Sequence, residues 1–508
     1  MTKDGVLSRI WPHYGLLALV AMAVMLPSFL FGPGATHSVS FNYIWTSQIG
    51  AALQQGDLYP RWLPQSFEGL GSPAFFFYPP LAYWLTGAIH AVGLSTLQAI
   101  NIGALLLLFA SGVTMHIWLT HRGTHPLAGA ILYMLLPYHQ LDFWMRGALA
   151  EFAAFIWLPL IALAIDRLPH RRGVVLLALS YAGLLITHMP TAMLSAFFLI
   201  APLIGVRAWA DRRVILPALT AGAIAAGLAG FYLVPALTLQ DAISSQMLWT
   251  PGYQPAAWTV WTLNFGLMPC TALGLAFLAW PSRSVWTVIV VVGGLAAMNL
   301  IPFLWDIPPL SRAQFPWRLL GIVEFAAVTA VMARRPSFVS GGIAIAFFTQ
   351  PYIRLFVVAA ATMGHPVDYA KMAWQMPDAV EYLPAGFDIG LIGEGRIANL
   401  NGYRTLPRAM EIDVKQAGPV TLRHAAFPIW RVTRDGREVA STGPLITFQA
   451  KPGHYRIERV TIWQEVAGLA LSIAAAMSLA LLFWRSRKSL AGEPIPLRIP
   501  TFQRRQPA

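Results

Sequence analysis

The sequence predicts a polytopic α-helical membrane protein, with about 12 spans and a long first outer loop, plus a small β-rich extracytoplasmic domain. Of its 508 residues, 56% are hydrophobic and only 11% are charged, where a soluble domain carries about 25% charged residues. Apolar segments long enough to cross a bilayer recur along the chain, and one late segment, 361–462, loses them. A soluble, disordered or collagen-like chain is excluded, because so few charges cannot cover so much apolar surface.

Charge and cysteine content narrow the partners. The formal net charge is +13, but the basic residues are spread through short loops rather than gathered on one face, so we expect a lipid bilayer and no nucleic acid as partner. The single cysteine, Cys270, allows no internal disulfide and no cysteine-based metal site. Lys3 and Arg9 precede an apolar run over 14–31, which we interpret as an uncleaved signal anchor.

Twelve segments approach the length of about 20 apolar residues that a membrane span requires. They are 13–31, 97–119, 126–138, 150–166, 173–187, 190–206, 214–237, 257–280, 284–301, 318–333, 337–360 and 463–484. An even number places both termini on the same side. A further apolar stretch, 79–93, is too short for a span, and crossing there would invert every later loop. We expect it to form a helix in the outer interface.

The positive-inside rule gives this threading its orientation. Ten arginines fall in the five short loops assigned to the inside: Arg122, Arg167, Arg171, Arg172, Arg207, Arg212, Arg213, Arg283, Arg334 and Arg335. The short outer loops hold only Arg146 and Arg312, with Arg318 at the edge of the next span. The expected location is the bacterial inner (plasma) membrane, multi-pass, with both termini cytoplasmic.

The threading divides the chain into four parts. They are a transmembrane bundle (1–360) with an outer loop at 32–96, a β-rich extracytoplasmic domain (361–462), a last transmembrane helix (463–484) and a basic cytoplasmic tail (485–508). Within the β-rich domain we expect strands at 420–425, 429–433, 445–450 and 455–460. The Asp435-Gly436 pair indicates a hairpin turn, and the proline- and arginine-rich end, 489–508, is typical of disorder.

The first outer loop is a candidate ligand site. Its prolines and glycines forbid regular helix over most of 55–80. Aromatic side chains together with Arg61, Asp57 and Glu68 suit a polar ligand at the membrane surface. The alternative for Phe75, Phe76 and Phe77 is an aromatic belt in the bilayer interface; for Arg61, Glu68 and Tyr78 it is a solvated or internally bonded loop.

The segment PYHQLDFWMRGALAE (137–151) is a second candidate. In a helix, Asp142 and Arg146 are four residues apart and share a face, so they can pair, and Glu151 begins the next span. Arginine suits phosphate because its planar fork donates two parallel hydrogen bonds. The alternative is a structural ion pair that closes a helix hairpin.

Two further segments carry polar residues at the outer face. His188 precedes Pro190 at the start of a span, and its alternative role is a capping or interface residue. Arg312, Gln314 and Arg318 lie at the outer mouth of another span, where Arg318 could simply snorkel to the interface. Because the outer side is poor in arginine, these residues together resemble a site for an anionic lipid head group.

These segments in this order resemble a known family. The chain is similar to the C-type superfamily of membrane glycosyltransferases, and within it to the bacterial 6-pyruvoyl-tetrahydropterin-synthase-related membrane proteins. The matching pieces are GDLYPRW (56–62), GLGSPAFFFYPPL (69–81), PYHQLDFWMRGALAE (137–151), HMPTA (188–192), FPWR (315–318), EYLP (381–384) and IWRVTRDGR (429–437). The resemblance implies a helix bundle that transfers sugar from a polyprenyl-phosphate donor to a glycan, lipid or protein acceptor on the outer leaflet.

The resemblance also implies a carboxylate base just after the first span, and here the sequence departs from the pattern. The expected pattern is an Asp followed four residues later by a His, and the corresponding positions hold Ser38 and Asn42. A base from elsewhere would be Glu68 first, Asp57 second or His37 third. Arg146, Arg312 and Arg318 would hold the phosphate, Trp62 and Tyr78 would contact the sugar, and Arg61, Asp142, Glu151, His188 and Gln314 would complete the site. A divalent metal ion is used by some relatives and stays open as a cofactor.

Two other functions remain open from the sequence. Without the carboxylate, the chain could be a catalytically inactive relative that binds polyprenyl lipid or scaffolds a glycan-assembly complex. A lipid or small-molecule transporter is the third possibility, but the ionisable residues cluster at the outer face rather than at mid-membrane. The sequence contains no Walker loop, G-x-S-x-G or H-E-x-x-H motif, which disfavours an ATP-driven pump and a zinc protease.

Overall fold

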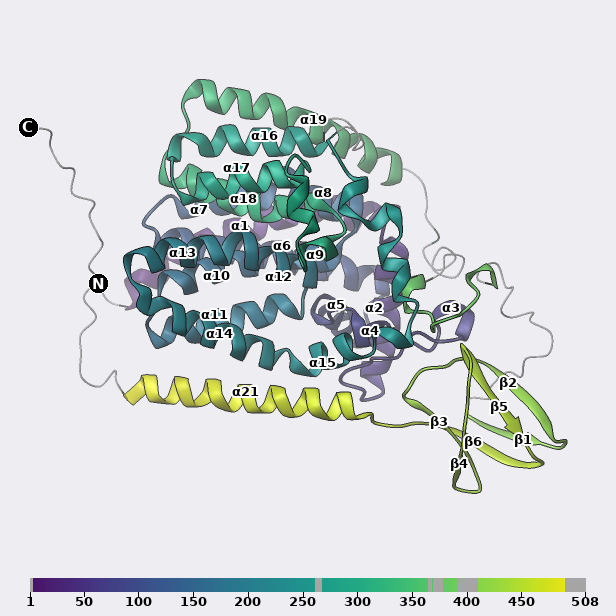
Figure 1. The fold of residues 1–508 in the computed structure, drawn as a ribbon. Coiled ribbons are helices and arrows are strands. Elements are labelled where there is room, and N and C mark those ends of the chain that lie inside the picture. Colours follow the sequence, from purple (N-terminus) through teal and green to yellow (C-terminus); the bar gives the residue numbers. More distant parts are fainter. Residues whose placement is uncertain (1–2, 261–266, 364–367, 369–377, 392–409, 489–508) are drawn as a thin grey trace, which may run out of the picture.

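A computed structural model describes residues 3–260, 267–363, 368, 378–391 and 410–488. The helices form an elongated bundle whose long axes run in broadly the same direction, and the strands form a separate domain beyond one end of it (Figure 1). The tail 489–508, predicted to be disordered, lies outside the described residues.

In the described part of the chain, seven helical segments are long and apolar enough to cross a membrane, or eight if a pair bent by 74° counts as one span. The seven are α1 (Lys3–Phe31), α6 (Thr96–His121), α9 (Leu149–Ala154) with α10 (Trp157–Asp166), α12 (Met189–Ser195) with α13 (Ala201–Ala210), the turn Pro316–Leu319 with α18 (Leu320–Ala333), α19 (Phe338–Met363) and α21 (Trp463–Lys488). The bent pair is α14 (Ile215–Leu228) and α15 (Gly230–Thr238).

The structure therefore does not confirm twelve full-length spans. The other predicted spans also contain helices, but these are short: α7 (Pro126–Leu135), α11 (Arg171–Leu185), α16 (Leu267–Ala279) and α17 (Val285–Ala297). These short helices lie alongside the long ones in the bundle (Figure 1). Helix α7 is limited by Pro137, which begins a separate helical turn two residues after α7 ends.

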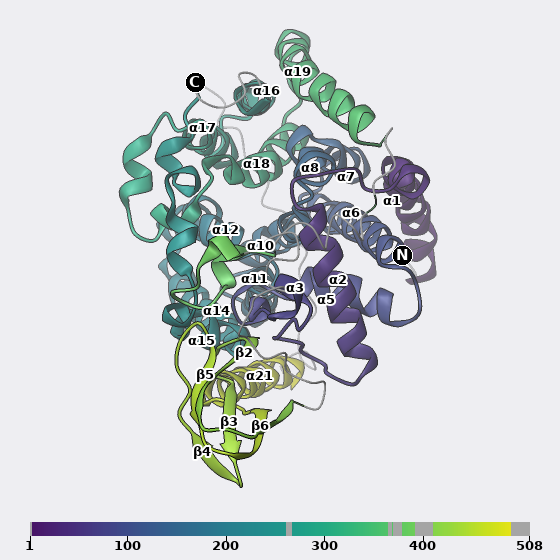
Figure 2. The ribbon, with the colours of Figure 1, turned by 90° about the vertical axis from the view of Figure 1, so that its right-hand side faces the viewer.

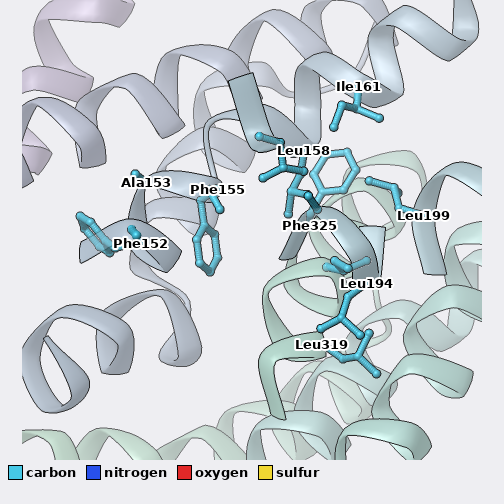
Figure 3. Packing of buried hydrophobic residues seen from close by; sticks show 14 of the residues in the cluster. Phe152, Ala153, Phe155, Leu158, Ile161, Leu194, Leu199, Leu319 and Phe325 are labelled. Atoms are coloured by element: carbon cyan, nitrogen blue, oxygen red, sulfur yellow. The ribbon is translucent and has the colours of Figure 1, made fainter. Parts of the chain in front are cut away.

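The core of the bundle is built around α9, α10 and α18. The most apolar stretch of the segment that contains α18 is 83% buried and that of α9–α10 is 78% buried, whereas the corresponding stretches of α19 and α21 are 17% and 11% buried. Phe155, Leu158 and Phe325 pack together there with Leu194 of α12 (Figure 3). The peripheral helices leave apolar faces uncovered, as expected for surfaces in contact with lipid.

Basic loops that the sequence assigns to the inside meet at one end of the bundle, which we call the basic end. Asp166 joins them, since its carboxylate lies 3.2 Å from Arg122 Nη1 and 3.5 Å from Arg207 Nη1. Arg207 also donates to the backbone oxygen of Leu168. Helix α1 begins and helix α21 ends toward this end, and the strands lie beyond the opposite end (Figure 1).

The first loop, 32–95, contains more helix than expected. Its main helices are α2 (Val39–Gln54) and α5 (Leu81–Ala91), which pack on each other, with single turns at α3 (Ser66–Gly69) and α4 (Ala74–Phe77). A Cβ atom on Gly87 would lie 2.5 Å from Ile49 Cγ2, so glycine permits this close packing. Helix α5 coincides with the helix predicted at 79–93.

The β-rich domain contains the predicted strands and two more. Strands β1 (Glu411–Val414), β6 (Gly453–Arg459), β3 (Trp430–Arg434) and β4 (Arg437–Val439) form one antiparallel sheet in that order, and β2 (Gly418–Ala425) pairs with β5 (Leu445–Ala450). The predicted hairpin is confirmed, because Arg434 pairs with Arg437 and both turn residues, Asp435 and Gly436, have positive φ. Strands β1 and β4 were not predicted.

Candidate functional site

The aromatic first loop is held inside the protein rather than in a membrane belt. Phe75 and Phe76 are fully buried and Phe77 nearly so. Phe427, just after β2, contacts Phe76 and Phe77, and the ring of Tyr382 stacks on Phe77 at 5.9 Å. The loop therefore lies between the bundle and the β-rich domain, and it is fixed by packing on both sides (Figure 2).

Arg61 and Trp62 join the first loop to the last helix and the β-rich domain. Arg61 Nε lies 3.3 Å from Glu465 Oε1 of α21, and its Nη2 donates to Phe231 O at 2.8 Å. Trp62 stacks on His424 of β2, with ring centroids 5.3 Å apart. These contacts account for both side chains within the fold.

The two acids proposed from the sequence as bases lie apart from each other. Asp57 is exposed and accepts a hydrogen bond from the backbone N–H of Tyr59. Glu68 belongs to the single turn α3, where its φ is +55°. That turn lies against β2, since Leu70 O accepts from Ala425 N at 2.9 Å.

An ionic cluster of Asp142, Arg146, Glu151, His188 and Arg318 forms at the opposite end from the basic end. Arg146 Nη1 contacts Asp142 Oδ1, the pair predicted from the four-residue spacing, and lies 2.9 Å from Glu151 Oε2. Arg318 Nε is 3.4 Å from the same Glu151 oxygen, and His188 Nε2 is 4.0 Å from it. Glu151 is thus the shared partner of two arginines from different parts of the chain.

The guanidinium groups of the cluster keep donors for a ligand. The side chains of Arg146 and Arg318 are 15% and 11% exposed, whereas Asp142 and Glu151 are buried. Arg318 Nη1 donates to Ala313 O and to Gln314 Oε1. Neither Nη2 atom makes a hydrogen bond to a residue that the structure describes, so both can donate to an anion.

Local structure explains how the cluster is positioned. Asp142–Arg146 form a single π-helical turn that ends at Gly147, whose φ of +62° reverses the chain into α9 and brings Glu151 back to Arg146. Glu324 of α18 accepts the backbone N–H groups of Tyr138 and His139, which begin the preceding turn α8 (Pro137–Leu141). Tyr138 OH donates to Glu151 Oε1 at 2.5 Å, a role that the sequence analysis missed.

The positions where the family pattern expects a carboxylate border this cluster. The backbone N–H of Ser38 donates to Arg146 O at 3.0 Å, and Asn42 Nδ2 donates to Gly147 O at 2.8 Å. Asn42 Oδ1 accepts from Tyr83 OH. The start of α2 therefore rests on the ionic cluster, with a serine where the resemblance implies an Asp and an asparagine where it implies a His. Partial desolvation and the charge of Arg146 lower the pKa of the adjacent His37.

Arg312 lies in a different setting from Arg146 and Arg318. Its guanidinium carbon is 4.2 Å from the ring centroid of Trp249. Both line an open pocket of about 560 Å³, together with Gln240, Asp241, Ser245 and Gln246. Gln314 is shared between the two regions, because its Nε2 donates to Leu248 O while its Oε1 accepts from Arg318.

The segment 378–385 is a part of the site whose position the sequence did not indicate. Asp378 Oδ1 accepts from Trp45 Nε1 of α2 at 2.8 Å. Downstream, Leu383 O accepts from Ser244 N at 2.8 Å and Ala385 N donates to Ala242 O at 3.2 Å. The segment thus bridges the first loop and the loop after α15. Trp45 and Asp378 are 333 residues apart in the chain, so no pattern of neighbouring residues could indicate that they meet.

Two titratable groups between the first loop and this segment have shifted pKa values. Burial raises the pKa of Tyr78 to about 12, while its phenol also lies within electrostatic range of Arg318, Glu151, Arg146 and Glu381. Burial, and secondarily the charge of Asp378, raise the pKa of Glu381 to about 7. Tyr78 is therefore near enough to both Glu381 and the ionic cluster for their charges to affect it.

The described residues do not fit a divalent metal site. Within them, no group of three or more His, Cys, Asp or Glu side chains converges. The two acids of the ionic cluster face arginines instead. Two guanidinium groups beside them suit an anion and not a cation.

Comparisons with solved structures give distant matches. A cryo-EM structure of the arabinofuranosyltransferase AftD from mycobacteria matches with 15% identity and a TM-score of 0.42, over 79% of this chain and 30% of that one. A mutant of the same protein matches with 16% identity and a TM-score of 0.38, over 69% and 27%. This chain thus spans under a third of the length of those proteins. No curated protein matches the sequence.

A family model gives a closer result. The 6-pyruvoyl-tetrahydropterin synthase related domain of membrane proteins matches residues 75–334, just over half of the chain. The matched region contains the ionic cluster and the turn that positions it. The chain belongs to the family of 6-pyruvoyl-tetrahydropterin synthase related membrane proteins.

Proposed function

We propose that this chain is a glycosyltransferase of the bacterial inner membrane. It transfers a sugar from a polyprenyl-phosphate donor to a glycan, lipid or protein acceptor on the outer leaflet, and both of its termini are cytoplasmic. The observation that carries the proposal is the ionic cluster, in which Arg146 and Arg318 are held by Glu151 and their side chains are partly exposed. The motifs shared with C-type membrane glycosyltransferases supply the reaction class.

The cluster suits a leaving phosphate. As the bond between the sugar and the phosphate breaks, negative charge grows on the phosphate oxygens, and cations fixed beforehand stabilise it without reorganising. Glu151 and Tyr138 hold Arg146 in place, and Gln314 together with Ala313 O holds Arg318. The polyprenyl chain would lie along the uncovered apolar helix faces, which are compatible with lipid tails.

The pocket around Trp249 suits the acceptor. An aromatic ring, two amide side chains, a carboxylate and Arg312 provide both a stacking surface and hydrogen-bonding groups. Sugars present apolar ring faces and many hydroxyl groups, which require both. Arg312 is therefore assigned to the acceptor rather than to the phosphate.

Of the two alternatives, only the inactive relative has specific support. Ser38 in place of an acid favours a catalytically inactive relative that binds polyprenyl lipid or scaffolds a glycan-assembly complex. A lipid or small-molecule transporter would need ionisable residues along a path through the membrane. Glu324 is such a residue, but it is occupied by two backbone N–H groups.

The test is a mass profile of envelope glycans and glycolipids from a strain lacking the gene, complemented with the wild-type gene or with R318Q. We expect the deletion to remove one defined sugar mass, the wild type to restore it and R318Q not to restore it. If the deletion leaves the profile unchanged under conditions in which the wild-type strain expresses the gene, the proposal is contradicted. Full restoration by R318Q would contradict the role of the ionic cluster.

A further inference from the structure

We propose that Glu381 is the catalytic base, the carboxylate that takes the proton from the acceptor hydroxyl during sugar transfer. This inference rests on the proposed function. It addresses the position after the first span, where Ser38 and Asn42 offer no carboxylate. The acid would come instead from the segment that precedes the β-rich domain.

The segment that carries Glu381 is rigidly placed at the site. Asp378 holds it to Trp45, and Leu383 and Pro384 are tied to Ser244 through hydrogen bonds of 2.8 and 3.0 Å. Tyr382, directly after Glu381, is buried and stacks on Phe77. A base must stay within hydrogen-bond reach of its substrate, and a segment fixed at both ends meets that need.

Packing places Glu381 beside the pocket assigned to the acceptor. The turn Val380–Tyr382 packs against Ser245–Trp249, and residues of the latter turn line the pocket. The phenol of Tyr78 lies within electrostatic range both of Glu381 and of Arg146, Glu151 and Arg318. Glu381 is thus next to the proposed acceptor site, and Tyr78 lies near both Glu381 and the proposed phosphate site.

The carboxylate of Glu381 is not held by an arginine or lysine among the described residues. Its side chain is partly exposed, and it accepts a hydrogen bond from its own backbone N–H. The neighbouring acids are occupied: Asp378 is buried and bonded to Trp45, while Asp142 and Glu151 are paired with Arg146. A general base is most effective when its pKa lies near the working pH, and burial holds that of Glu381 near neutrality.

The proposed step balances without any further reactant. The carboxylate of Glu381 accepts the proton of an acceptor hydroxyl as the hydroxyl oxygen forms a bond to the anomeric carbon of the sugar. The bond between that carbon and the phosphate oxygen breaks, and its electron pair leaves with the polyprenyl phosphate. Arg146 and Arg318 stabilise the charge of the leaving phosphate.

Three other residues compete for this role. Glu68 lies on the turn covered by β2, Asp57 is exposed beside Tyr59, and His37 lies next to Arg146, whose charge disfavours its protonated form. Of these residues, His37 is the one on which the charge of Arg146 acts. The base is identified by comparing the transfer rates of E381Q, E68Q, D57N and H37Q.

The experiment measures transfer rates in membranes from the deletion strain that carry the full-length wild type or each variant. We expect E381Q to lower the rate by about 10²–10⁴-fold, the usual contribution of a general base, with little change in KM for the donor. Wild-type activity should rise through about pH 7, and the residual activity of E381Q should not follow that rise. D388N, which changes an exposed acid on the same segment, is the matched control.

Three results keep the test decisive. If the wild type transfers sugar and E381Q keeps more than a tenth of its rate, Glu381 is not the base, although the proposed function stands. If the rate falls equally in E381Q and E68Q, the variant whose residual activity no longer follows pH identifies the base. If E381Q is poorly folded, E381D must retain partial, pH-dependent activity, and its complete inactivity at wild-type protein levels would overturn the inference.

Discussion

Arg146 is the side chain with the most demanding geometry in the ionic cluster. Its Nη1 alone meets Asp142, Glu151 and Tyr138, while its other donors stay open for an anion. Lysine would keep the charge and lose the planar fork that donates in parallel. Hydrogen bonds to charged groups contribute about 1.5–3 kcal/mol, so R146K should lower the transfer rate by about 10- to 100-fold.

A rate assay on membranes with equal amounts of each protein checks this expectation. R207K is the matched control, because Arg207 makes a similar ion pair with Asp166 at the basic end. R207K should stay within a few-fold of the wild type. Equal losses in both variants would show that arginine chemistry at the cluster is not special.

The raised pKa of Glu381 should also make the stability of the fold depend on pH. In the unfolded chain its proton leaves near pH 4.5, whereas in the fold it is retained until about pH 7. Folding is therefore weakened as pH rises through this window, because the buried group must ionise. Glutamine carries no charge, so E381Q should melt at a higher temperature than the wild type at pH 8 and at nearly the same temperature at pH 5.

Thermal unfolding of the two proteins in detergent at both pH values is the measurement. D388N changes an exposed acid on the same segment, and its difference from the wild type should be equal at pH 5 and pH 8. A pH-independent effect of E381Q would mean that burial does not disfavour this carboxylate. The predicted gain in stability of E381Q at pH 8 would fit a residue that is kept for function although it destabilises the fold.

The sequence predicted pairs of interacting side chains only where the two partners lie close along the chain. The spacing of Asp142 and Arg146 predicted a pair, which is present. It could not indicate that Arg318 reaches Glu151, that Arg312 lies over Trp249 instead, or that Asp378 meets Trp45. Those contacts depend on how distant helices pack, and one sequence without homologues carries no record of that packing.

Among the elements, the last helix is tied to the first loop by a buried ion pair. Arg61 and Glu465 are 8% and 10% exposed, and Glu465 also accepts from Arg459 and from Ile462 N. Removing one member of a buried pair leaves the other charge uncompensated, at a cost of about 3–5 kcal/mol. E465Q should therefore lower the melting temperature clearly.

E438Q is the control for this ion pair. Glu438 pairs with Arg431 within the β-rich domain, but it is 69% exposed. Exposed pairs contribute about 0–1 kcal/mol, so E438Q should leave the melting temperature almost unchanged. If E465Q and E438Q behaved alike, the Arg61–Glu465 contact would not hold the elements together.

The sequence predicted the elements better than their lengths. Every predicted span contains a helix, and the Asp435-Gly436 hairpin forms where expected, because periodic apolar residues and turn residues act locally. Helices such as α7 and α17 are shorter than the apolar runs suggest. An apolar run cannot tell a full span from a short helix that is covered by neighbouring helices. Strands β1 and β4 are only four and three residues long.

The whole molecule has two unlike ends, and this predicts its orientation. Basic loops meet around Asp166, and the β-rich domain lies at the opposite end (Figure 1). With Cys270 replaced by serine, single cysteines at Asp435 and Arg213 should report the two sides. A membrane-impermeant maleimide should label D435C in intact spheroplasts and R213C only after permeabilisation. The reverse pattern would contradict the positive-inside assignment.

The proposed donor of this protein is a polyprenyl-phosphate sugar. The most direct test incubates purified full-length protein in liposomes with the polyprenyl-phosphate sugars and acceptor glycans extracted from the wild-type envelope. Mass spectrometry then follows both lipid species. We predict that one sugar-bearing lipid is consumed as free polyprenyl phosphate appears in equal amount, and that R318Q slows this conversion strongly. If no such lipid is consumed by the folded wild-type protein, the claim is contradicted.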